Sequence, residues 1–405
     1  MHVLRIRDFA LFLGGRFFAV LAAQIQWVAI GWYLYDLTGD PMTLGWAGLS
    51  AFLPIALLTL PAGDLADRVD RRHLLAGAHL FQASAAAMLL GLVAFKVSVT
   101  LPFYAALVLS GTTRALAGPA AKSLAPLLVP REQFAQSIAW TTSAQQTANI
   151  LGPALGGFIY LAGAPTVFSV CLALALATSI AMLAIRTRVV ASREPGSMVE
   201  RAAAGLRYLR TQPIVFGAIT LDLFAVLIGG VTALLPVFAR DVLHVGPEGL
   251  GIMRSAIAVG AIGTALFLAQ LPDARQPHAG RALFGGVAIF GVAVLVFGLS
   301  SHFWLSLAAL AAIGAGDGLS VFVRATVIQL ATPPEMRGRV SAIHVLFVGA
   351  TNELGEFRAG LFAAWLGAVP AALAGGIGAL TIVALWAWFF PDLRRVDRLS
   401  EVSVK

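Results

Sequence analysis

Four acidic side chains interrupt long apolar stretches in the second half of the chain: Asp222, Asp317, Glu353 and Glu356. A charged side chain at the centre of a bilayer costs about 2.5–3.5 kcal/mol or more, so residues of this kind are candidates for function. Glu353 and Glu356 are three residues apart and share one face of a helix. Two neighbouring carboxyl groups in a poorly hydrated cleft do not both ionise readily, so one of them binds a proton near neutral pH. Asp222 and Asp317 are rival proton carriers.

These acids could instead have a purely structural role, in which each forms an ion pair with a basic residue at the same depth of the membrane. The conceivable ion pairs are Glu356 with Arg358, Asp317 with Arg324, and Asp222 with an arginine of another helix. Two arginines of the first half, Arg16 and Arg114, have two possible roles of equal weight. They could bind a substrate carboxylate or phenolate, or they could hold a gate closed by pairing with acids of the second half.

Uncharged side chains add further candidates for a ligand cavity. They are Gln24, Trp27, Gln145, Asn149 and Asn352. The amides could offer hydrogen bonds to a ligand, but hydrogen bonding between helices explains them equally well. Trp27 could line a cavity, although tryptophan in membrane proteins is more often an interfacial or packing residue.

Several kinds of chemistry have no motif in this chain. There is no G-x-x-x-x-G-K-[ST] loop for a nucleotide phosphate, and the seven histidines lack metal-ligand spacing. The single cysteine, Cys171, excludes an intrachain disulfide and a cysteine-based zinc site. We therefore expect neither an enzyme nor a cofactor or metal site.

The elements that must carry these residues are membrane-spanning helices. Of 405 residues, 59% are hydrophobic and 12% are charged, and the mean hydropathy is +0.86. A span needs about 20 apolar residues, so there is material for roughly twelve. The first stretch is too long for a cleaved signal peptide. The expected spans are 9–37, 43–66, 72–95, 101–128, 132–160, 164–186, 213–240, 248–271, 281–299, 302–331, 335–365 and 369–391.

The positions of the basic residues predict the topology. Twenty of the 28 lysines and arginines lie at the ends and in one set of alternate loops, whereas the opposite loops contain only Lys96 and Arg240. An excess of lysine and arginine marks the cytoplasmic side. Both termini are therefore expected in the cytoplasm, and the basic balance indicates topology and not nucleic-acid binding.

The two halves of the chain also show an internal sequence repeat. Pro130, Ser137 and Gly156 recur as Pro334, Ser341 and Gly360, each 204 residues later. The repeat predicts a six-helix bundle at 1–190, a cytoplasmic linker with a short amphipathic helix at 191–212, and a second six-helix bundle at 213–405. Duplicated bundles of this kind bind substrate near the midplane and rock against each other.

The loop after the second expected span carries the most specific motif. It contains Gly63, Asp67, Arg68, Arg71 and Arg72. The spacing resembles the G-x-L-a-D-R-x-x-R-R signature of the major facilitator superfamily, with Asp70 in place of the usual second glycine. The resemblance implies a gate latch in which Asp67 contacts the eleventh helix. The alternative is an ordinary positively charged turn, and the second-half copy (Asp273 and Arg275) is degraded.

The fifth expected span contains a second motif, formed by Gly152, Pro153, Gly156 and Gly157. It is similar to the antiporter motif G-x-x-x-G-P-x-x-G-G, with Ala148 in place of the first glycine. The resemblance implies that the helix can bend at this motif and that its contact with the facing helix excludes protons. The alternative is ordinary packing of small residues between helices. Further stretches, 24–38 and 334–341 among them, resemble the enterobactin-exporter and macrolide-efflux branch.

This resemblance implies an all-α membrane protein with the major facilitator fold, in which twelve transmembrane helices form two pseudo-symmetric bundles. It implies proton-coupled export of a small amphipathic compound, drug-like or siderophore-like, across the cytoplasmic membrane. The expected partners are this small molecule, protons and membrane lipid, without nucleic acid, and we expect a monomer. The alternatives are an importer or lipid flippase of the same fold, and a non-transporting receptor or membrane-embedded enzyme.

Overall fold

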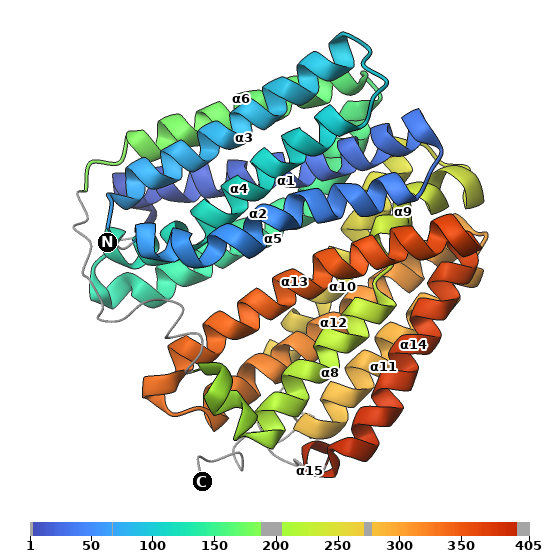
Figure 1. The fold of residues 1–405 in the computed structure, drawn as a ribbon. Coiled ribbons are helices and arrows are strands. Elements are labelled where there is room, and N and C mark those ends of the chain that lie inside the picture. The colour runs from blue at the N-terminus through green and yellow to red at the C-terminus, as the bar shows by residue number, and fades with distance from the viewer. Residues whose placement is uncertain (1–2, 67, 188–204, 271–277, 395–405) are drawn as a thin grey trace. The chain divides into compact units, whose positions relative to one another are not determined.

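The computed structural model describes residues 3–66, 68–187, 205–270 and 278–394 of the chain, and these residues form helices joined by short connections (Figure 1). By its contacts the chain divides into two units. Unit 1 comprises Met1–Gly39, Trp46–Met198 and Val245–Ser255, and unit 2 comprises Asp40–Gly45, Val199–His244 and Ala256–Lys405.

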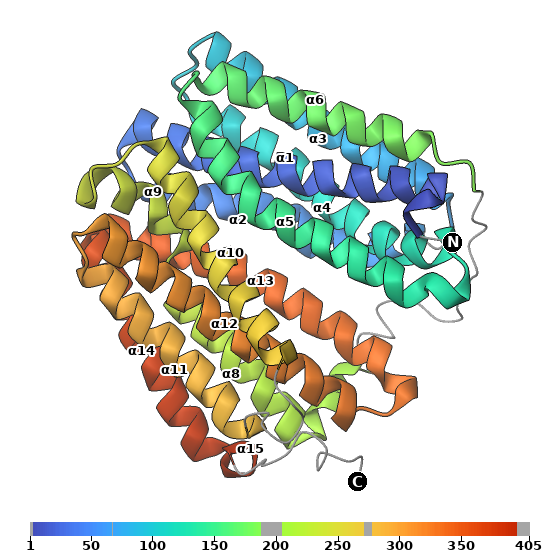
Figure 2. The ribbon, with the colours of Figure 1, turned by 180° about the vertical axis from the view of Figure 1, so that it is seen from behind.

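Six long helices make up most of unit 1. They are α1 (Arg7–Thr38), α2 (Met42–Ala66), α3 (Arg71–Ala94), α4 (Leu101–Leu124), α5 (Phe134–Tyr160) and α6 (Ala164–Leu183). Helix α1 packs against α5 and α6, and α3 packs against α4 and α6 (Figure 2). Buried side chains such as Phe103 and Phe168 fill the space between these helices.

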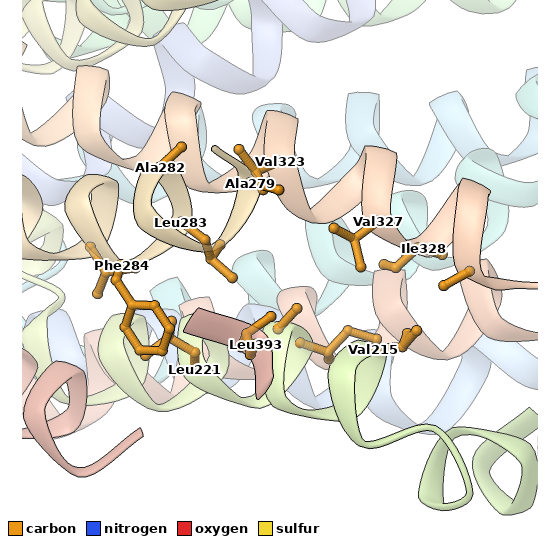
Figure 3. Close-up of a cluster of buried hydrophobic side chains, with 14 of the residues drawn as sticks. Val215, Leu221, Ala279, Ala282, Leu283, Phe284, Val323, Val327, Ile328 and Leu393 are labelled. Atoms are coloured by element: carbon orange, nitrogen blue, oxygen red, sulfur yellow. The ribbon is translucent and has the colours of Figure 1, made fainter. Parts of the chain in front are cut away.

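Most of unit 2 is formed by a second set of long helices. They are α8 (Pro213–Gly229), α10 (Pro247–Gln270), α11 (Ala279–Leu299), α12 (Phe303–Ala331), α13 (Pro334–Leu366) and α14 (Ala368–Phe389), followed by the short α15 (Pro391–Arg394). Helix α11 packs against both α12 and α14, and α14 also packs against α8. A cluster of buried side chains that includes Leu221, Leu283, Val327 and Leu393 joins α8, α11, α12 and α15 (Figure 3).

The described helices suit a bilayer by length and by surface. Within the described residues, nine helical segments are at least 18 residues long and apolar enough to cross a membrane. Many large apolar side chains remain exposed, including Leu57, Trp304 and Trp388. Water disfavours such a surface whereas lipid does not, and backbone polar groups in lipid must be satisfied within helices. The protein is therefore a multi-pass membrane protein.

Helix boundaries agree with the sequence expectation at most positions, and the prediction of one continuous seventh helix over 213–240 is wrong. Helix α8 ends at Gly229, and the chain continues through a 3₁₀ turn (Thr232–Leu234), the short α9 (Leu235–Val237) and a π-helical turn (Phe238–Val242). The helix ends at two consecutive glycines, which have low helix propensity, and the backbone leaves the helical region at Gly230 (φ −59°, ψ 126°). The fourth helix also ends earlier than predicted, at Leu124, where a 3₁₀ turn over Ala125–Leu128 replaces its last part.

One arginine donates hydrogen bonds to backbone carbonyls that lack a helical partner at the end of α8. Arg358 of α13 donates from Nε to the carbonyl of Leu227 (2.8 Å) and from Nη2 to the carbonyl of Gly230 (3.1 Å). Its guanidinium also lies 5.3 Å from the centre of the Phe362 ring. Arg358 therefore stabilises the end of α8 from a neighbouring helix.

Replacing Arg358 with methionine should lower the thermal stability of the protein. The change leaves the carbonyls of Leu227 and Gly230 without their donor, at a cost of about 1–3 kcal/mol for each buried group. Thermal unfolding of the purified protein measures this effect. Arg394→Met is the matched control, because Arg394 is exposed. An unchanged melting temperature in Arg358→Met would contradict the capping role.

Candidate functional site

A buried ion pair joins α8 and α12 inside unit 2. Arg324 of α12 pairs through Nη1 with a carboxylate oxygen of Asp222 on α8, and both side chains are almost completely buried. The hydroxyl of Ser320, one turn before Arg324, donates to the other oxygen of Asp222 at 3.0 Å. Of the pairings considered from the sequence, that of Asp222 with an arginine of another helix is therefore present.

Asp317 lies beside this ion pair. It is three residues before Ser320 on α12, and with Asp222 and Ser320 it lines a small cavity that is closed by Val287 and Phe290 of α11. The cavity measures about 10 Å³, which is close to the space that one water molecule requires. Two carboxyl groups thus share a mostly apolar pocket, and one of them is paired with the Arg324 guanidinium.

The charges of this cluster do not cancel when both carboxyl groups are ionised. Asp222 and Asp317 are close enough to repel each other, and Arg324 attracts both of them. His344 of α13 is also within electrostatic reach of Asp222 and Arg324. Burying a net charge is costly unless it is paired, and a proton on one carboxyl group would neutralise the cluster. The arrangement can therefore take up and release one proton.

The other pair of acids lies on α13. Glu353 is buried and Glu356 is half-buried. Asn352, next to Glu353, is exposed. Neither glutamate lines the cavity that contains Asp222 and Asp317. Asp222 and Asp317 therefore share one cavity between α8 and α12, and Glu353 and Glu356 lie on α13 outside its lining.

In unit 1 the polar candidates gather between α1 and α5. Arg16 donates from Nη2 to the amide oxygen of Gln145 at 3.3 Å. Farther along the same helices, Gln24 donates to Asn149 at 3.0 Å, and Asn149 donates to Gln146 at 3.0 Å. These groups form hydrogen bonds between α1 and α5 and along α5. Hydrogen bonding between helices was one of the two explanations considered for the amides.

The remaining cavity candidates of unit 1 lie elsewhere. Trp27 is half-buried and packs against the apolar core between the helices. Arg114 is exposed on α4. Neither residue lines a cavity of about 250 Å³ in unit 1 whose lining includes Arg16, Lys122 and Gln145.

A buried polar network between α1, α3 and α4 was not predicted from the sequence. Gln82 of α3 donates to Gln26 of α1, and Gln26 donates to Ser110 of α4, both at 2.8 Å. All three side chains are buried. The network cross-links three helices, and only the polarity of these residues within apolar stretches could have suggested it.

The gate motif extends from the last part of α2 to the start of α3, where Arg71 and Arg72 bind backbone carbonyls. Arg71 donates to Ala66 at the end of α2 (3.3 Å) and to Ser123 near the end of α4 (3.1 Å). Arg72 donates to the carbonyl of Ile185 after α6 at 2.6 Å. These contacts tie together the ends of four helices. Gly63 lies within α2 and Arg68 is exposed, while Asp67 lies outside the described residues, as do residues 191–204 of the expected linker.

Asp70, which replaces the usual glycine of the motif, is the N-cap of α3. Its carboxylate accepts from the backbone N–H of Arg72 at 3.0 Å and pairs with the Arg72 guanidinium at 2.5 Å. The hydrogen bonds from Arg72 hold the pKa of Asp70 below its usual value, against the opposing effect of burial. The carboxylate is therefore more stable in the folded protein than in the unfolded chain.

Asp70→Asn should destabilise the protein by about 1 kcal/mol at neutral pH, because asparagine still caps a helix but lacks the charge. A lowered pKa contributes stability above the unfolded value of about 3.9, and this contribution is lost as the pH falls through the folded value. The difference in melting temperature between wild type and variant should therefore shrink below about pH 4. A difference that stays constant down to pH 3 would contradict the ion pair.

Two glycines of the second motif, Gly152 and Gly156, pack α5 onto α1, while Gly157 faces the start of α10 at Pro247. A Cβ atom at Gly152 would lie 2.5 Å from the Cβ of Gln24, and one at Gly156 would lie 3.0 Å from the Cα of Ile25. Pro153 and Gly157 are also buried. Close packing of this kind is how small residues bring membrane helices together. The packing interpretation of these residues therefore has direct geometric support.

Comparison with known proteins places this architecture in a family. The profile of the family described as transmembrane secretion effector, a branch of the major facilitator superfamily, matches residues 2–405. Macrolide efflux protein A of Streptococcus pyogenes is 26% identical over 367 residues, which cover 87% of this chain and 88% of that protein. Enterobactin exporter EntS of Citrobacter koseri is 23% identical over 393 residues, covering 95% and 92%.

Solved structures agree at the level of the fold. A D-xylose–proton symporter superimposes with a TM-score of 0.73 at 12% identity, covering 100% of this chain and 99% of that one. The fold is therefore that of the major facilitator superfamily, all-α with two six-helix bundles. The match along the whole sequence, and not only the fold, shows that this chain belongs to the transmembrane secretion effector family of major facilitator transporters.

Proposed function

We propose that this transporter exports a small amphipathic compound from the cytoplasm in exchange for protons. The cluster of Asp222, Asp317 and Arg324 carries the proposal, because it can gain or lose one proton within an apolar interior. The relatives named as a macrolide efflux protein and an enterobactin exporter support the direction and the kind of cargo.

In this mechanism Asp317 is the proton carrier. With Asp222 held by Arg324 and Ser320, a proton on Asp317 leaves the cluster neutral, and its loss leaves a net negative charge. The protonated and deprotonated clusters therefore favour different conformations of the surrounding helices. A ligand shifts such an equilibrium only through its different affinities for the two states, so proton and cargo must favour opposite access states.

The other expectations from the sequence complete the proposal. The protein lies in the cytoplasmic membrane as a monomer with both termini in the cytoplasm, and it acts as a transporter and not as an enzyme. Residues 1–190 and 213–405 are the two moving bundles, with the linker at 191–212. The gate motif biases the access states through Arg71 and Arg72, which tie helix ends together.

Everted membrane vesicles test both direction and coupling. Vesicles from cells that produce the protein are acidified inside by ATP hydrolysis, and uptake of a radiolabelled macrolide and of radiolabelled enterobactin is measured. Export in the cell corresponds to accumulation in these vesicles. The proposal predicts that at least one compound accumulates, that a protonophore abolishes the accumulation, and that vesicles without the protein show none.

Other outcomes of the same measurement would assign other functions. Accumulation that needs an alkaline interior would indicate an importer. Movement of labelled phospholipid between leaflets, without accumulation of either compound, would indicate a flippase. No gradient-dependent movement of macrolide, siderophore or lipid would overturn the proposed function and favour a receptor-like or enzymatic role.

A further inference from the structure

A cavity in unit 1, lined by residues of α1, α4 and α5, combines two cationic side chains with an apolar wall. Its volume of about 250 Å³ is slightly below the range for ligand pockets, about 300–1,000 Å³. Phe12, Phe134 and Ile138 are part of the apolar wall. Apolar walls with a few convergent polar groups are typical of small-molecule sites.

The charged groups of this cavity are Arg16 from α1 and Lys122 from α4. They are close enough to repel each other, and none of the residues that line the cavity is acidic. Arg16 is half-buried, and the contact described for it is to the neutral oxygen of Gln145. Lys122 is exposed, so the cost of desolvation falls mainly on Arg16. Repulsion between the two like charges is unfavourable, and a bound anion would relieve it and would stabilise the partly desolvated Arg16.

Neutral donors stand beside the two cations. The hydroxyl groups of Thr141 and Thr142 and the amide of Gln145 line the same cavity. Thr141 donates along its own helix to the carbonyl of Ser137 at 2.8 Å. Gln145 accepts from Arg16 through its oxygen, so its NH₂ group remains a donor for a ligand. An oxyanion can accept from the two cations, the Gln145 amide and the Thr142 hydroxyl together, whereas the Thr141 hydrogen is already bonded to Ser137.

We propose that this cavity binds the anionic group, a carboxylate or a phosphate, of a ligand whose adjoining body is apolar. Arg16 and Lys122 hold the anion, and the wall of phenylalanine and isoleucine side chains holds the apolar part. A soluble anionic amphipath and the headgroup of an anionic lipid share this chemistry. Identifying the soluble anion with the exported compound rests on the proposed function, whereas the preference for an anion does not.

The test compares two probes that differ in charge and hardly in shape, 2-naphthoate and 2-naphthamide. Calorimetric titration of the full chain in a neutral detergent gives both affinities without a pH gradient. We expect the carboxylate to bind at least about tenfold more tightly, since charge-assisted hydrogen bonds are the stronger kind. Arg16→Gln should reduce this preference to about one, and Lys122→Gln should reduce it about threefold.

Matched variants separate the anion site from general effects of charge and folding. Arg131→Gln and Lys96→Gln remove exposed charges of the same unit outside the cavity and should leave the preference unchanged. Arg16→Lys keeps the charge and should restore most of the preference lost in Arg16→Gln. Equal binding of the two probes to wild type, or an unchanged preference in both Arg16→Gln and Lys122→Gln, would overturn the proposal.

The source of the anion is decided in lipid nanodiscs. If phosphatidylglycerol in a phosphatidylcholine disc lowers the affinity of wild type for 2-naphthoate, the site holds a lipid headgroup. If the affinity does not change, the site is kept for a soluble anion. Failure of the export assay with an intact carboxylate preference would overturn the proposed function alone, and the reverse result would overturn this inference alone.

Discussion

Asp317→Asn should abolish proton-driven accumulation while leaving cargo exchange intact. Asparagine keeps the size and polarity of the side chain but cannot take up or release a proton. We expect the accumulation ratio in acidified everted vesicles to fall to about one, because the gradient no longer favours either state. Counterflow of labelled against unlabelled cargo, which needs no proton movement, should stay within about twofold of wild type.

Asp317 is a sharper probe than Asp222. Removing the carboxylate of Asp222 leaves the guanidinium of Arg324 buried without its partner, and breaking a buried pair costs about 3–5 kcal/mol. Asp392→Asn, an exposed aspartate of the same unit, is the matched control and should leave both assays unchanged. If Asp317→Asn still accumulates cargo, Asp317 is not the carrier, and Glu353→Gln combined with Glu356→Gln tests the other pair.

Gly314→Ala should strongly destabilise unit 2, although the change adds only one methyl group. A Cβ atom at Gly314 would overlap the carbonyl oxygen of Ile257 on α10, and one at Gly260 would overlap the carbonyl oxygen of Ala311 on α12. The two helices therefore meet backbone to backbone, and no flexible side chain can move aside. Overpacking of this kind costs about 1–3 kcal/mol and more where backbone must shift. The melting temperature of the detergent-purified protein measures the loss.

Gly263→Ala on α10 provides the matched control, because a Cβ atom there would have no neighbour within 4 Å. Alanine is favoured over glycine inside a helix by about 0.5–1 kcal/mol, so this variant should be as stable as wild type or slightly more stable. Gly314→Ala and Gly260→Ala combined should cost less than the sum of the single changes, since the first already separates the helices. Equal melting temperatures for Gly314→Ala and Gly263→Ala would contradict the close contact.

Unit 1 contains an equivalent contact between α2 and α4. A Cβ atom at Gly111 would overlap the carbonyl oxygen of Ala51. Gly111 and Gly314 lie in the fourth long helix of each half of the chain. Close approach of the second and fourth helices is therefore common to both halves, which agrees with the repeat seen in the sequence.

Much of the fold could be predicted because the bilayer imposes a simple length requirement. Apolar stretches of about 20 residues between polar turns locate the spans without knowledge of any contact. The seventh span shows where this reasoning fails. Its hydropathy continues past Gly229, and the helix ends there with Arg358 of another helix binding the freed carbonyls.

The candidate site was predictable as a set of residues but not as a set of contacts. Apolar surroundings alone single out Asp222, Asp317, Glu353, Glu356 and Arg16. Their partners depend on how each helix is rotated and where it crosses its neighbours. From the sequence, Asp317 on the same helix was considered as the partner of Arg324. In the structure Arg324 pairs with Asp222, which is 102 positions before it in the chain. The sequence also did not indicate that Lys122 of α4 lines the same cavity as Arg16 of α1.

The sequence by itself determined that this chain crosses a membrane many times, that its halves repeat, and that it carries transporter motifs. Hydropathy and motif spacing are properties of the linear chain, and the preference of apolar segments for lipid follows from them without knowledge of any contact between helices. Only the tertiary structure decided which carboxyl groups share a cavity, that Asp70 caps a helix, and that Arg16 and Lys122 line one cavity. Those facts depend on side chains from different helices meeting at a few ångströms, a distance that packing sets and linear spacing does not.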